Sequence, residues 1–384
     1  MAHLEVTHQS WFQRQMNSLL AMLVGIALVI GACCLLFWNE GRAVKTTQAL
    51  DEGARVVQSL PSPEKMNPAM EGRLVHVTGM ARTDCIVRDP VLNLSLNCLN
   101  LQRCVEYYQW VEEKESETYE NADGGTTTYT RYSYSQRWVE EPVSSSQFKE
   151  PGHHNTVACR FSCPDIWLAP DVRLGDFRLN PGQVSRAGVR RPVNLAQLEL
   201  PDVYAGRAVI DSDFLYIGSV APPVPANPSV GDVRIRWVAA ESECPVSLVA
   251  QQSGNSFKPY KAESGYTVDL LQDGLHTAPA MFEKALSDNI LLTWFLRGGG
   301  AILMFFGVLL LFQFLKVLCS IIPLVGSMVE AGIFVVSVLI ALSLSLIVIA
   351  AAWFFYRPLL AACIIFFGAM PLYYIIMKRR RKAA

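Results

Sequence analysis

Long apolar runs at both ends of the chain constrain its fold more than any other feature. Residues 19–38 contain no charged side chain, and about 20 such residues are enough to cross the roughly 30 Å hydrocarbon core of a bilayer. Residues 298–315, 331–354 and 359–377 repeat this pattern near the C-terminus. The four segments predict a membrane protein with four transmembrane α-helices, one N-terminal and three C-terminal.

The region between these runs, residues 39–290, has the composition of an ordinary globular domain. Residues 43–60 have the apolar spacing of an amphipathic helix. After it, alternation of apolar and polar residues predicts short strands, most clearly a hairpin of residues 105–112 and 128–139. The sequence therefore predicts a large β-rich α+β domain inserted between the first span and the last three.

Charge at the C-terminus predicts the orientation of the chain. Residues 378–384 contain five consecutive basic side chains and are expected to stay in the cytosol. Four spans then leave the N-terminal tail, residues 1–18, in the cytosol and the β-rich domain on the opposite, extracytosolic side. Residues 316–330 are apolar but contain proline and glycine, so we expect an interfacial connection there.

Aromatic residues cluster in the hairpin. With alternation of period two, the members of each strand share one face, where cross-strand aromatic pairs stabilise sheets. This pattern predicts either a packed sheet face or an interaction surface for a ligand or partner. The residues concerned are Tyr108, Trp110, Tyr132, Tyr134 and Trp138.

Six cysteines fall in the domain expected outside the cytosol. An even number in an oxidising compartment favours disulfides, without indicating the pairing. They are Cys85, Cys98, Cys104, Cys159, Cys163 and Cys244. An alternative for Cys159 and Cys163 is a zinc site with His153 and His154, although their spacing is weak evidence for it.

Motifs of the common enzyme classes are absent from the sequence, and the predicted protein has no catalytic residue, cofactor or metal. The net charge of −1 gives no basis for nucleic-acid binding. An enzyme would need His76, His153 or His154 to converge with carboxylates in a pocket. A passive channel would need a polar stripe along a span, and only Gln313, Ser343 and Ser345 offer polar side chains for one.

Charged residues lie close to the predicted ends of the spans or at the start of the sheet. They are Glu40, Arg42, Arg73 and Arg357. Arg357 precedes a proline between the last two spans, so we expect a tight turn there. We further hypothesise that Arg357 pairs with Glu40 or with another acid near the membrane.

Short motifs along the whole chain resemble the LUMA family, also called transmembrane protein forty-three. They are NEGRA at 39–43, EGRLVH at 71–76, YQWVE at 108–112, TRYSY at 130–134, GDVR at 231–234 and WFFYRPL at 353–359. The resemblance implies one N-terminal span, a large luminal domain and three C-terminal spans. It also implies a non-enzymatic scaffold that organises membrane-protein complexes and associates with itself.

The same resemblance implies a location and partners. In a eukaryotic cell these would be the endoplasmic reticulum, the inner nuclear membrane and lamin-associated membrane proteins. The six cysteines and the compact basic tail depart from what we expect of animal members. They suit a bacterial or otherwise distant relative, and in a bacterium the domain would face the periplasm from the inner membrane.

Overall fold

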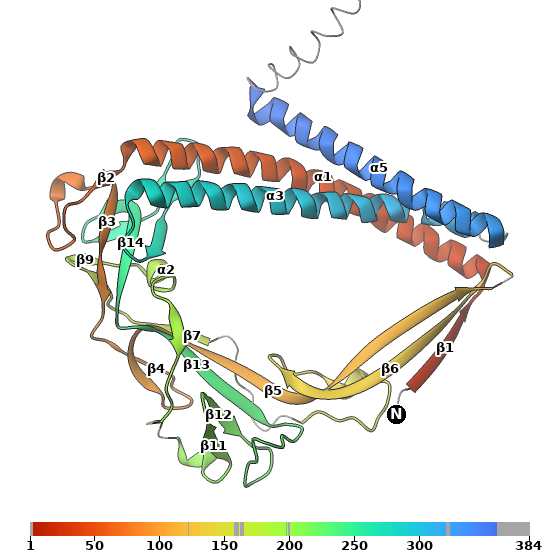
Figure 1. The fold of residues 1–384 in the computed structure, drawn as a ribbon, viewed down its shortest axis with the longest axis horizontal. Helices are drawn as coiled ribbons and strands as arrows, with labels where there is room; N and C mark the ends of the chain where they lie inside the picture. The colour runs from red at the N-terminus through yellow and green to blue at the C-terminus, as the bar shows by residue number, and fades with distance from the viewer. Residues whose placement is uncertain are drawn as a thin grey trace, which may run out of the picture.

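A computed structural model describes residues 3–121, 123–156, 161, 165–196, 198, 200–319 and 323–358. The long helices form one layer, and the strands form a β-rich domain and a long arm beneath it (Figure 1). The helices are α1 (Trp11–Val56), α2 (Pro181–Val184), α3 (Ala278–Leu311), α4 (Gln313–Cys319) and α5 (Pro323–Tyr356), with short 3-10 turns at Pro68–Met70, Ser145–Gln147 and Asp202–Tyr204.

Three helices in the described part of the chain are long and apolar enough to cross a membrane: α1, α3 continued through α4, and α5 from Ala331 onward. The predicted combination of membrane-capable helices with a large β-rich domain is therefore confirmed. The predicted fourth span, residues 359–377, and the basic tail lie outside the described residues.

Helix α1 is one continuous helix that includes both the predicted first span and most of the amphipathic helix expected after it. Ser10 caps its start by accepting a hydrogen bond from the backbone N–H of Gln13. The chain then has no proline until Pro61, so nothing interrupts the helix where the span was expected to end. At about 1.5 Å per residue, α1 is about 69 Å long, roughly twice the thickness of the hydrocarbon core.

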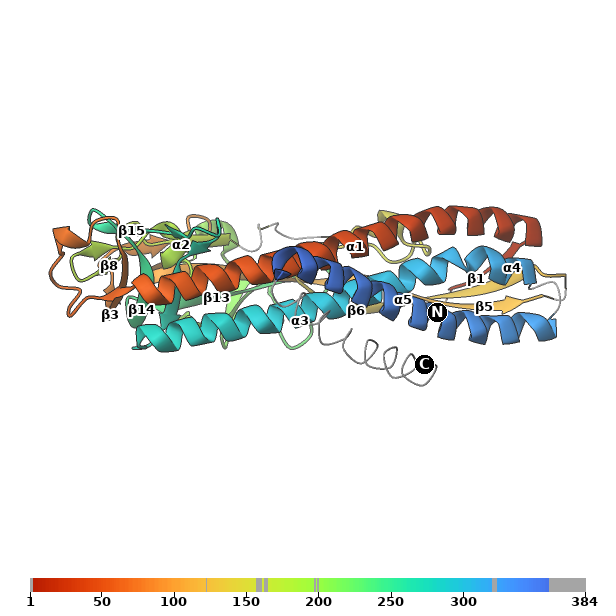
Figure 2. The ribbon, with the colours of Figure 1, turned by 90° about the horizontal axis from the view of Figure 1, so that it is seen from above.

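Glycines bring the helices of the layer into backbone contact. A Cβ atom on Gly25 of α1 would lie 2.8 Å from the carbonyl oxygen of Gly307 on α3. Further along, a Cβ atom on Gly300 would lie 2.5 Å from Leu36. Seen from above, α1 and α3 run side by side, and α5 crosses over them (Figure 2). Small residues are thus required at this interface for steric reasons.

The strands form two large sheets and one small one. The first has nine strands, ordered β1-β6-β5-β13-β12-β11 with β4, β7 and β10 attached to its sides, and the second has seven, ordered β18-β14-β15-β9-β8-β3-β2. The strands are β1 (His3–Gln9), β2 (Gln58–Ser59), β3 (Leu74–Arg82), β4 (Ile86–Arg88), β5 (Ser95–Glu120), β6 (Thr126–Val139), β7 (Asp165–Leu168), β8 (Arg173–Leu174), β9 (Phe177–Arg178), β10 (Arg190–Pro192), β11 (Ala208–Asp211), β12 (Phe214–Ile217), β13 (Val233–Glu241), β14 (Glu243–Ser253), β15 (Ser256–Lys258), β16 (Tyr260–Lys261), β17 (Thr267–Val268) and β18 (Leu270–Asp273).

The main core of the domain lies between these sheets and is formed by alternate residues of β3, β5, β13 and β14, including the fully buried Trp237. A second cluster attaches the domain to the helical layer. In it, Leu50 of α1 and Phe282 of α3 pack against Leu74 and Val249 of the seven-stranded sheet. The domain end of the helical layer is therefore held by apolar contacts.

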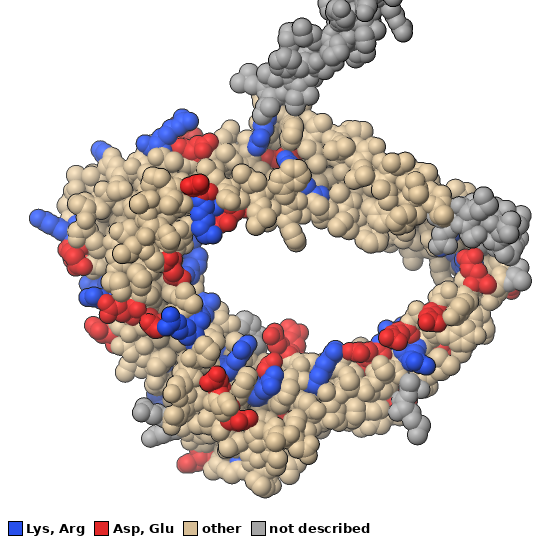
Figure 3. Space-filling view, in the orientation of Figure 1, with Lys and Arg blue, Asp and Glu red and all other residues tan. Residues whose placement is uncertain are grey.

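Strands β5 and β6 extend far beyond the domain as a two-stranded arm, which confirms the predicted hairpin. The tip of the arm reaches the start of α1, where β1 pairs antiparallel with β6 from His3–Tyr132 to Gln9–Thr126. The N-terminal tail, expected on the opposite side of a membrane from the domain, is thus an edge strand of the domain's main sheet. Helical layer, domain and arm together enclose an opening, and the helical side of this opening is largely free of charge (Figure 3).

Candidate functional site

The most unusual polar group in the helical layer is the carboxylate of Glu40, which is fully buried within α1. Arg297 of α3 donates two hydrogen bonds to it, from Nε at 2.6 Å and from Nη2 at 2.8 Å. Trp353 of α5 donates a third from its indole N–H, at 2.8 Å. One carboxylate therefore joins three helices, and its oxygens are satisfied as a buried charge requires.

Aromatic rings surround the arginine of this pair. The Arg297 guanidinium lies 4.8 Å from the ring centroid of Trp294 and 5.8 Å from that of Trp353. Both distances are within the range of cation–π attraction. Next to them, a Cβ atom on Gly41 would lie 2.6 Å from the ring of Tyr356, so only glycine fits at that position. The junction is thus closed by aromatic side chains on the α5 side.

A row of polar contacts continues from this junction toward the domain. Arg42 donates to the side-chain oxygens of Asn289 at 2.9 Å and Thr293 at 3.0 Å on α3. Asn39 donates to the backbone carbonyl of Thr293, and Asn289 donates to that of Ala43. We call this row, together with Glu40, Arg297 and Trp353, the polar junction. Every bond in the row links α1 to α3, which fixes the register of the two helices.

The residues expected near the membrane surface divide between two places. Glu40 and Arg42 belong to the polar junction. Arg73 is exposed just before β3, and neither it nor Arg357 forms an ion pair with any acid that the structure describes. The hypothesis that Arg357 pairs with Glu40 is therefore wrong, because Arg297 occupies that carboxylate. Arg297 directly precedes the glycine-rich start of the second predicted span. This position was the only signal in the sequence that pointed to Arg297.

The five aromatic residues of the hairpin lie on one face, as the strand register requires. Tyr108 is opposite Trp138, and Glu112 is opposite Tyr134. The rings of Tyr108 and Trp138 are 5.2 Å apart, and the Arg234 guanidinium lies 4.5 Å from the Trp138 ring. Arg234 is in turn paired with Glu106 at 2.6 Å. This end of the face is packed by the neighbouring strands.

The other end of the face is covered by the segment that follows β6. His153 stacks on Tyr134 with ring centroids 4.1 Å apart and meets Trp110 edge-on at 4.4 Å. Tyr132 is buried under β1, where its hydroxyl donates to Glu5 at 2.8 Å. All five aromatic residues are buried or half-buried by the chain itself, and their role as an interaction face stays a prediction.

The three histidines considered for catalysis do not converge. His76 lies in β3 of the seven-stranded sheet, where it bonds to the Ser59 hydroxyl at 3.2 Å and to the His276 carbonyl at 2.9 Å. Burial lowers the pKa of His76 below its ordinary value of 6.5. His153 and His154 follow β6 of the other sheet. Among the described residues, no group of three His, Cys, Asp or Glu side chains is placed to hold a metal.

The candidate disulfide cysteines are only partly within the described residues. Cys85, Cys98 and Cys244 carry free thiols, Cys104 is half-buried in β5, and Cys159 and Cys163 lie outside the described residues. Burial raises the pKa of the Cys98 thiol to about 11, and burial together with Asp273 and Glu241 raises that of Cys244 to about 11. Disulfides that involve Cys159 or Cys163 stay a prediction.

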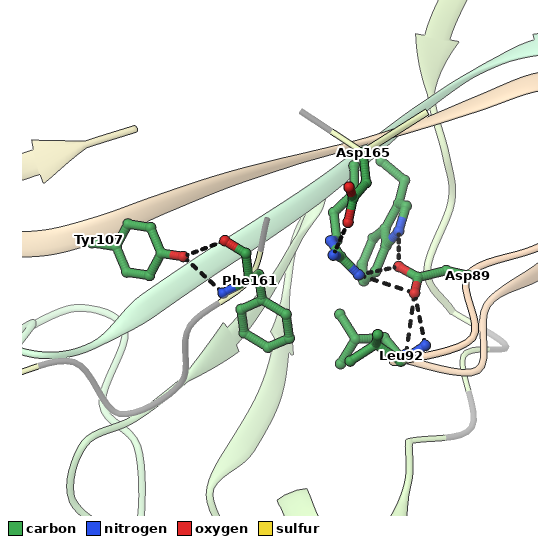
Figure 4. A network of polar contacts seen from close by, with 8 residues as sticks. Asp89, Leu92, Tyr107, Phe161 and Asp165 are labelled. Carbon is green, nitrogen blue, oxygen red and sulfur yellow. Dashed lines mark hydrogen bonds and ion pairs between the residues drawn. The ribbon is translucent and has the colours of Figure 1, made fainter. Parts of the chain in front are cut away.

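A second buried ion pair lies inside the domain and was not predicted from the sequence. Arg103 of β5 donates to both oxygens of Asp89, at 3.0 and 2.8 Å, and to Asp165 at 2.6 Å (Figure 4). The indole N–H of Trp237 also donates to Asp89, at 3.0 Å. Arg103 and Asp89 are 1% and 0% exposed, so this network holds β5, β7 and β13 together rather than facing a substrate.

Comparison with known proteins identifies relatives over most of the chain. The family model described as transmembrane protein 43 matches residues 107–358. Transmembrane protein 43 of Rattus norvegicus is 36% identical over 360 residues, which cover 90% of this chain and 88% of the relative. The Homo sapiens protein is 34% identical over 85% of this chain and 82% of its own length. A Drosophila melanogaster homolog is 32% identical over 84% and 85%. No solved structure matches.

Proposed function

The chain belongs to the transmembrane protein 43 family, and from this premise we propose that it is a non-enzymatic scaffold of the membrane. In this role its β-rich domain binds other membrane proteins, and copies of the chain associate with one another. In a eukaryotic cell the membranes would be the endoplasmic reticulum and the inner nuclear membrane, with lamin-associated partners. In a bacterium it would be the inner membrane.

The observation that carries this proposal is the attachment of the β-rich domain to both ends of the helical layer. At one end Leu50 and Phe282 pack on the seven-stranded sheet. At the other end the arm is joined to β1 by strand pairing and to Arg14 of α1, which donates to Glu120 at 2.7 Å. A domain held at two points presents its surface in a constant orientation to the membrane, as a scaffold requires.

Self-association has a candidate surface in β1. Within the described part of the chain, β1 pairs with β6 alone and is therefore an edge of the nine-stranded sheet. An edge strand has unpaired backbone N–H and C=O groups that can pair with another chain. The side chains of Leu4 and Val6 on this strand are exposed. We propose that two copies meet along this edge.

The proposal is tested by the oligomeric state of the full chain extracted from membranes into lipid nanodiscs. We expect the mass of a dimer or a larger assembly. The variant Val6→Lys, which places a charge on the edge strand, should shift the mass toward the monomer. Val203→Lys, at an exposed site in the domain, is the matched control and should keep the assembly. A wild-type monomer at all concentrations would contradict self-association.

The alternative functions receive less support from the positions of their residues. Ser345 is buried against the other helices, whereas Ser343 is exposed on a different side of α5, so the two hydroxyls do not line one path for a channel. The histidines named for an enzyme lie apart, His76 in β3 and His153 and His154 in the segment that follows β6. No described observation favours either alternative over the scaffold.

A further inference from the structure

Strand β11 is a second open edge of the nine-stranded sheet. Within the described part of the chain it pairs with β12 alone, and β1 is the last strand at the other end of the same sheet. In Figure 1, β11 lies on the side of the domain that is remote from the helical layer. The long helices therefore do not cover this edge.

The strand register shows which backbone groups of β11 point outward. In an antiparallel pair, opposite residues alternate between those that exchange hydrogen bonds and those that do not. The Gly218 N–H donates to the Arg207 carbonyl at 2.8 Å, and the pairing continues from this bond through β11. By alternation, the N–H and C=O groups of Ala208 and Ile210 point away from β12. They pair with no other strand that the structure describes, so a further strand can bond to them.

Exposed apolar side chains lie on this edge and next to it. Val209 and Ile210 of β11 are 38% and 37% exposed. In the loop between β12 and β13, Val220 and Val224 are 67% and 53% exposed. This loop begins beside β11, because its first residue, Gly218, is bonded to the residue that precedes the strand. Apolar side chains that are exposed as a group, rather than singly, mark binding surfaces.

The buried carboxylate of Asp232 fixes the conformation of this loop. It accepts hydrogen bonds from the backbone N–H groups of Ser219 at 2.6 Å and of Ser229 at 2.7 Å. The hydroxyls of Ser219 and Tyr216 also donate to it. The loop contains four prolines, which restrict its backbone further. The surface is thus ordered before a partner binds, which lowers the entropic cost of binding.

The charge of this surface indicates the chemistry of a partner. Asp202, Asp211 and Asp213 are exposed and form no ion pair with any residue that the structure describes. Between residues 200 and 233 the sequence contains one basic residue, Arg207, whose guanidinium donates to backbone carbonyls of the loop. The edge is therefore acidic, and it favours a basic partner over an acidic one.

We infer that β11 is a docking edge for an extended segment of another membrane protein, in which apolar and basic residues alternate. The segment adds a strand to the sheet through the outward backbone groups of Ala208 and Ile210. Side chains alternate between the two faces of a strand, so the apolar residues of the segment contact Ile210 while its basic residues pair with Asp211. The inference rests on the proposed scaffold function and names the surface and the kind of partner through which it acts.

The test measures peptide binding to the full chain in nanodiscs of phosphatidylcholine, whose lack of net charge keeps a basic probe off the bilayer. The probe is a fluorescent eight-residue peptide that alternates lysine and valine, titrated by fluorescence anisotropy. We expect saturable binding, and binding at least about tenfold weaker for two control peptides. One control has glutamate in place of lysine. The other has methyl groups on alternate backbone nitrogens, which removes the donors that strand pairing needs.

Two variants locate the binding at β11. Ile210→Pro removes an outward N–H at an edge, where proline is tolerated, and should weaken binding of the lysine peptide. Asp211→Lys should weaken the lysine peptide and strengthen the glutamate peptide, a reversal that misfolding cannot produce. The matched control is Val6→Lys on β1, at the other end of the sheet, which should leave peptide binding unchanged.

Three results would overturn the inference: no saturable binding up to millimolar peptide, equal binding of the methylated peptide, or a loss of binding in Val6→Lys but not in the β11 variants. A change in the mass of the assembly in Asp211→Lys would show that a second copy of the chain occupies this edge, and would also overturn it. A wild-type monomer that still binds the lysine peptide would contradict self-association alone. An assembly of normal mass without peptide binding would contradict the docking edge alone.

Discussion

Glu40 and Arg297 are 257 positions apart in the chain, yet they form a two-bonded ion pair in which the carboxylate is fully buried. The pair joins α1 to α3, and Trp353 extends it to α5. A buried pair contributes less to stability than its Coulomb attraction suggests, because both charges lose their hydration. Replacing only one residue of the pair is nevertheless costly, because the remaining buried charge then has no partner. The pair therefore specifies one arrangement of the three helices.

Replacing one partner of this pair should destabilise the helical layer strongly. We expect Arg297→Met to lower the free energy of unfolding by about 3–5 kcal/mol, because Glu40 is left charged and buried. The double variant Glu40→Gln, Arg297→Met should recover part of this loss. The measurement is thermal or denaturant unfolding of the purified protein in detergent. Arg357→Ala is the matched control, and a loss as large as that of Arg297→Met would refute the assignment of Arg297 as the partner.

The close approach of α1 and α3 at Gly25 should not tolerate a larger side chain. Gly25→Val would place atoms against the Gly307 backbone, and we expect a loss of about 1–3 kcal/mol as the helices move apart. Gly31→Val on the same helix has open space around its Cβ position and serves as the control. Equal unfolding midpoints for the two variants would show that the contact does not hold the helices.

The buried pair of the domain gives a prediction that does not involve the membrane. Arg103→Met should lower stability by about 3–5 kcal/mol, since Asp89 would keep only neutral partners such as the Trp237 indole. Arg82→Met removes an exposed ion pair with Glu243 and should change stability by less than about 1 kcal/mol. Limited proteolysis of the domain measures both. Similar protease resistance of the two variants would argue against a structural role for Arg103.

Acid should destabilise the seven-stranded sheet through His76. Burial lowers the folded-state pKa of His76 below 6.5, which is near its value in the unfolded chain. The unfolded chain therefore binds the proton more tightly, and the stability contributed by neutral His76 is complete above pH 6.5 and is lost as the pH falls toward the folded pKa. We expect the unfolding temperature of His76→Gln to fall less than that of the wild type between pH 7.5 and 5.5. Identical slopes would contradict this role.

The described thiols should differ in reactivity. Cys98 and Cys244 have pKa values of about 11, so at pH 7.5 almost none of either is the reactive thiolate. Cys85 is half-buried at the surface of the domain and should be alkylated before Cys98 and Cys244 in the folded, reduced protein. Mass spectrometry after short treatment with a maleimide identifies the modified cysteines. Modification of Cys98 before Cys85 would show that its site opens readily.

Features that depend on neighbouring residues could be predicted from the sequence. The apolar runs of α1, α3 and α5 reveal membrane-capable helices by length alone, and alternation with the Asp123-Gly124 turn reveals the hairpin. The shared face of the five aromatic residues follows from the same period of two. Each of these patterns is visible within a window of a few residues.

Features that depend on distant contacts could not be predicted in this way. Whether Glu40 pairs with Arg297 or Arg357 depends on how three helices are aligned, and both arginines are adjacent to apolar runs. Arg103 and Asp89 are 14 positions apart, and only the fold brings the Trp237 indole next to the Asp89 carboxylate. The pairing of β1 with β6 was missed because charge at the C-terminus placed the two segments on opposite sides of a membrane.

The closed outline of helical layer, domain and arm affects the mechanics of the molecule. An isolated helix as long as α1 can curve gently without breaking any contact between its ends. In this structure the arm and the domain connect the two ends of α1, so bending α1 changes the distance that the arm must span. The backbone hydrogen bonds between β5 and β6 resist such a change. Curvature imposed on the helices must therefore also deform the paired strands of the arm.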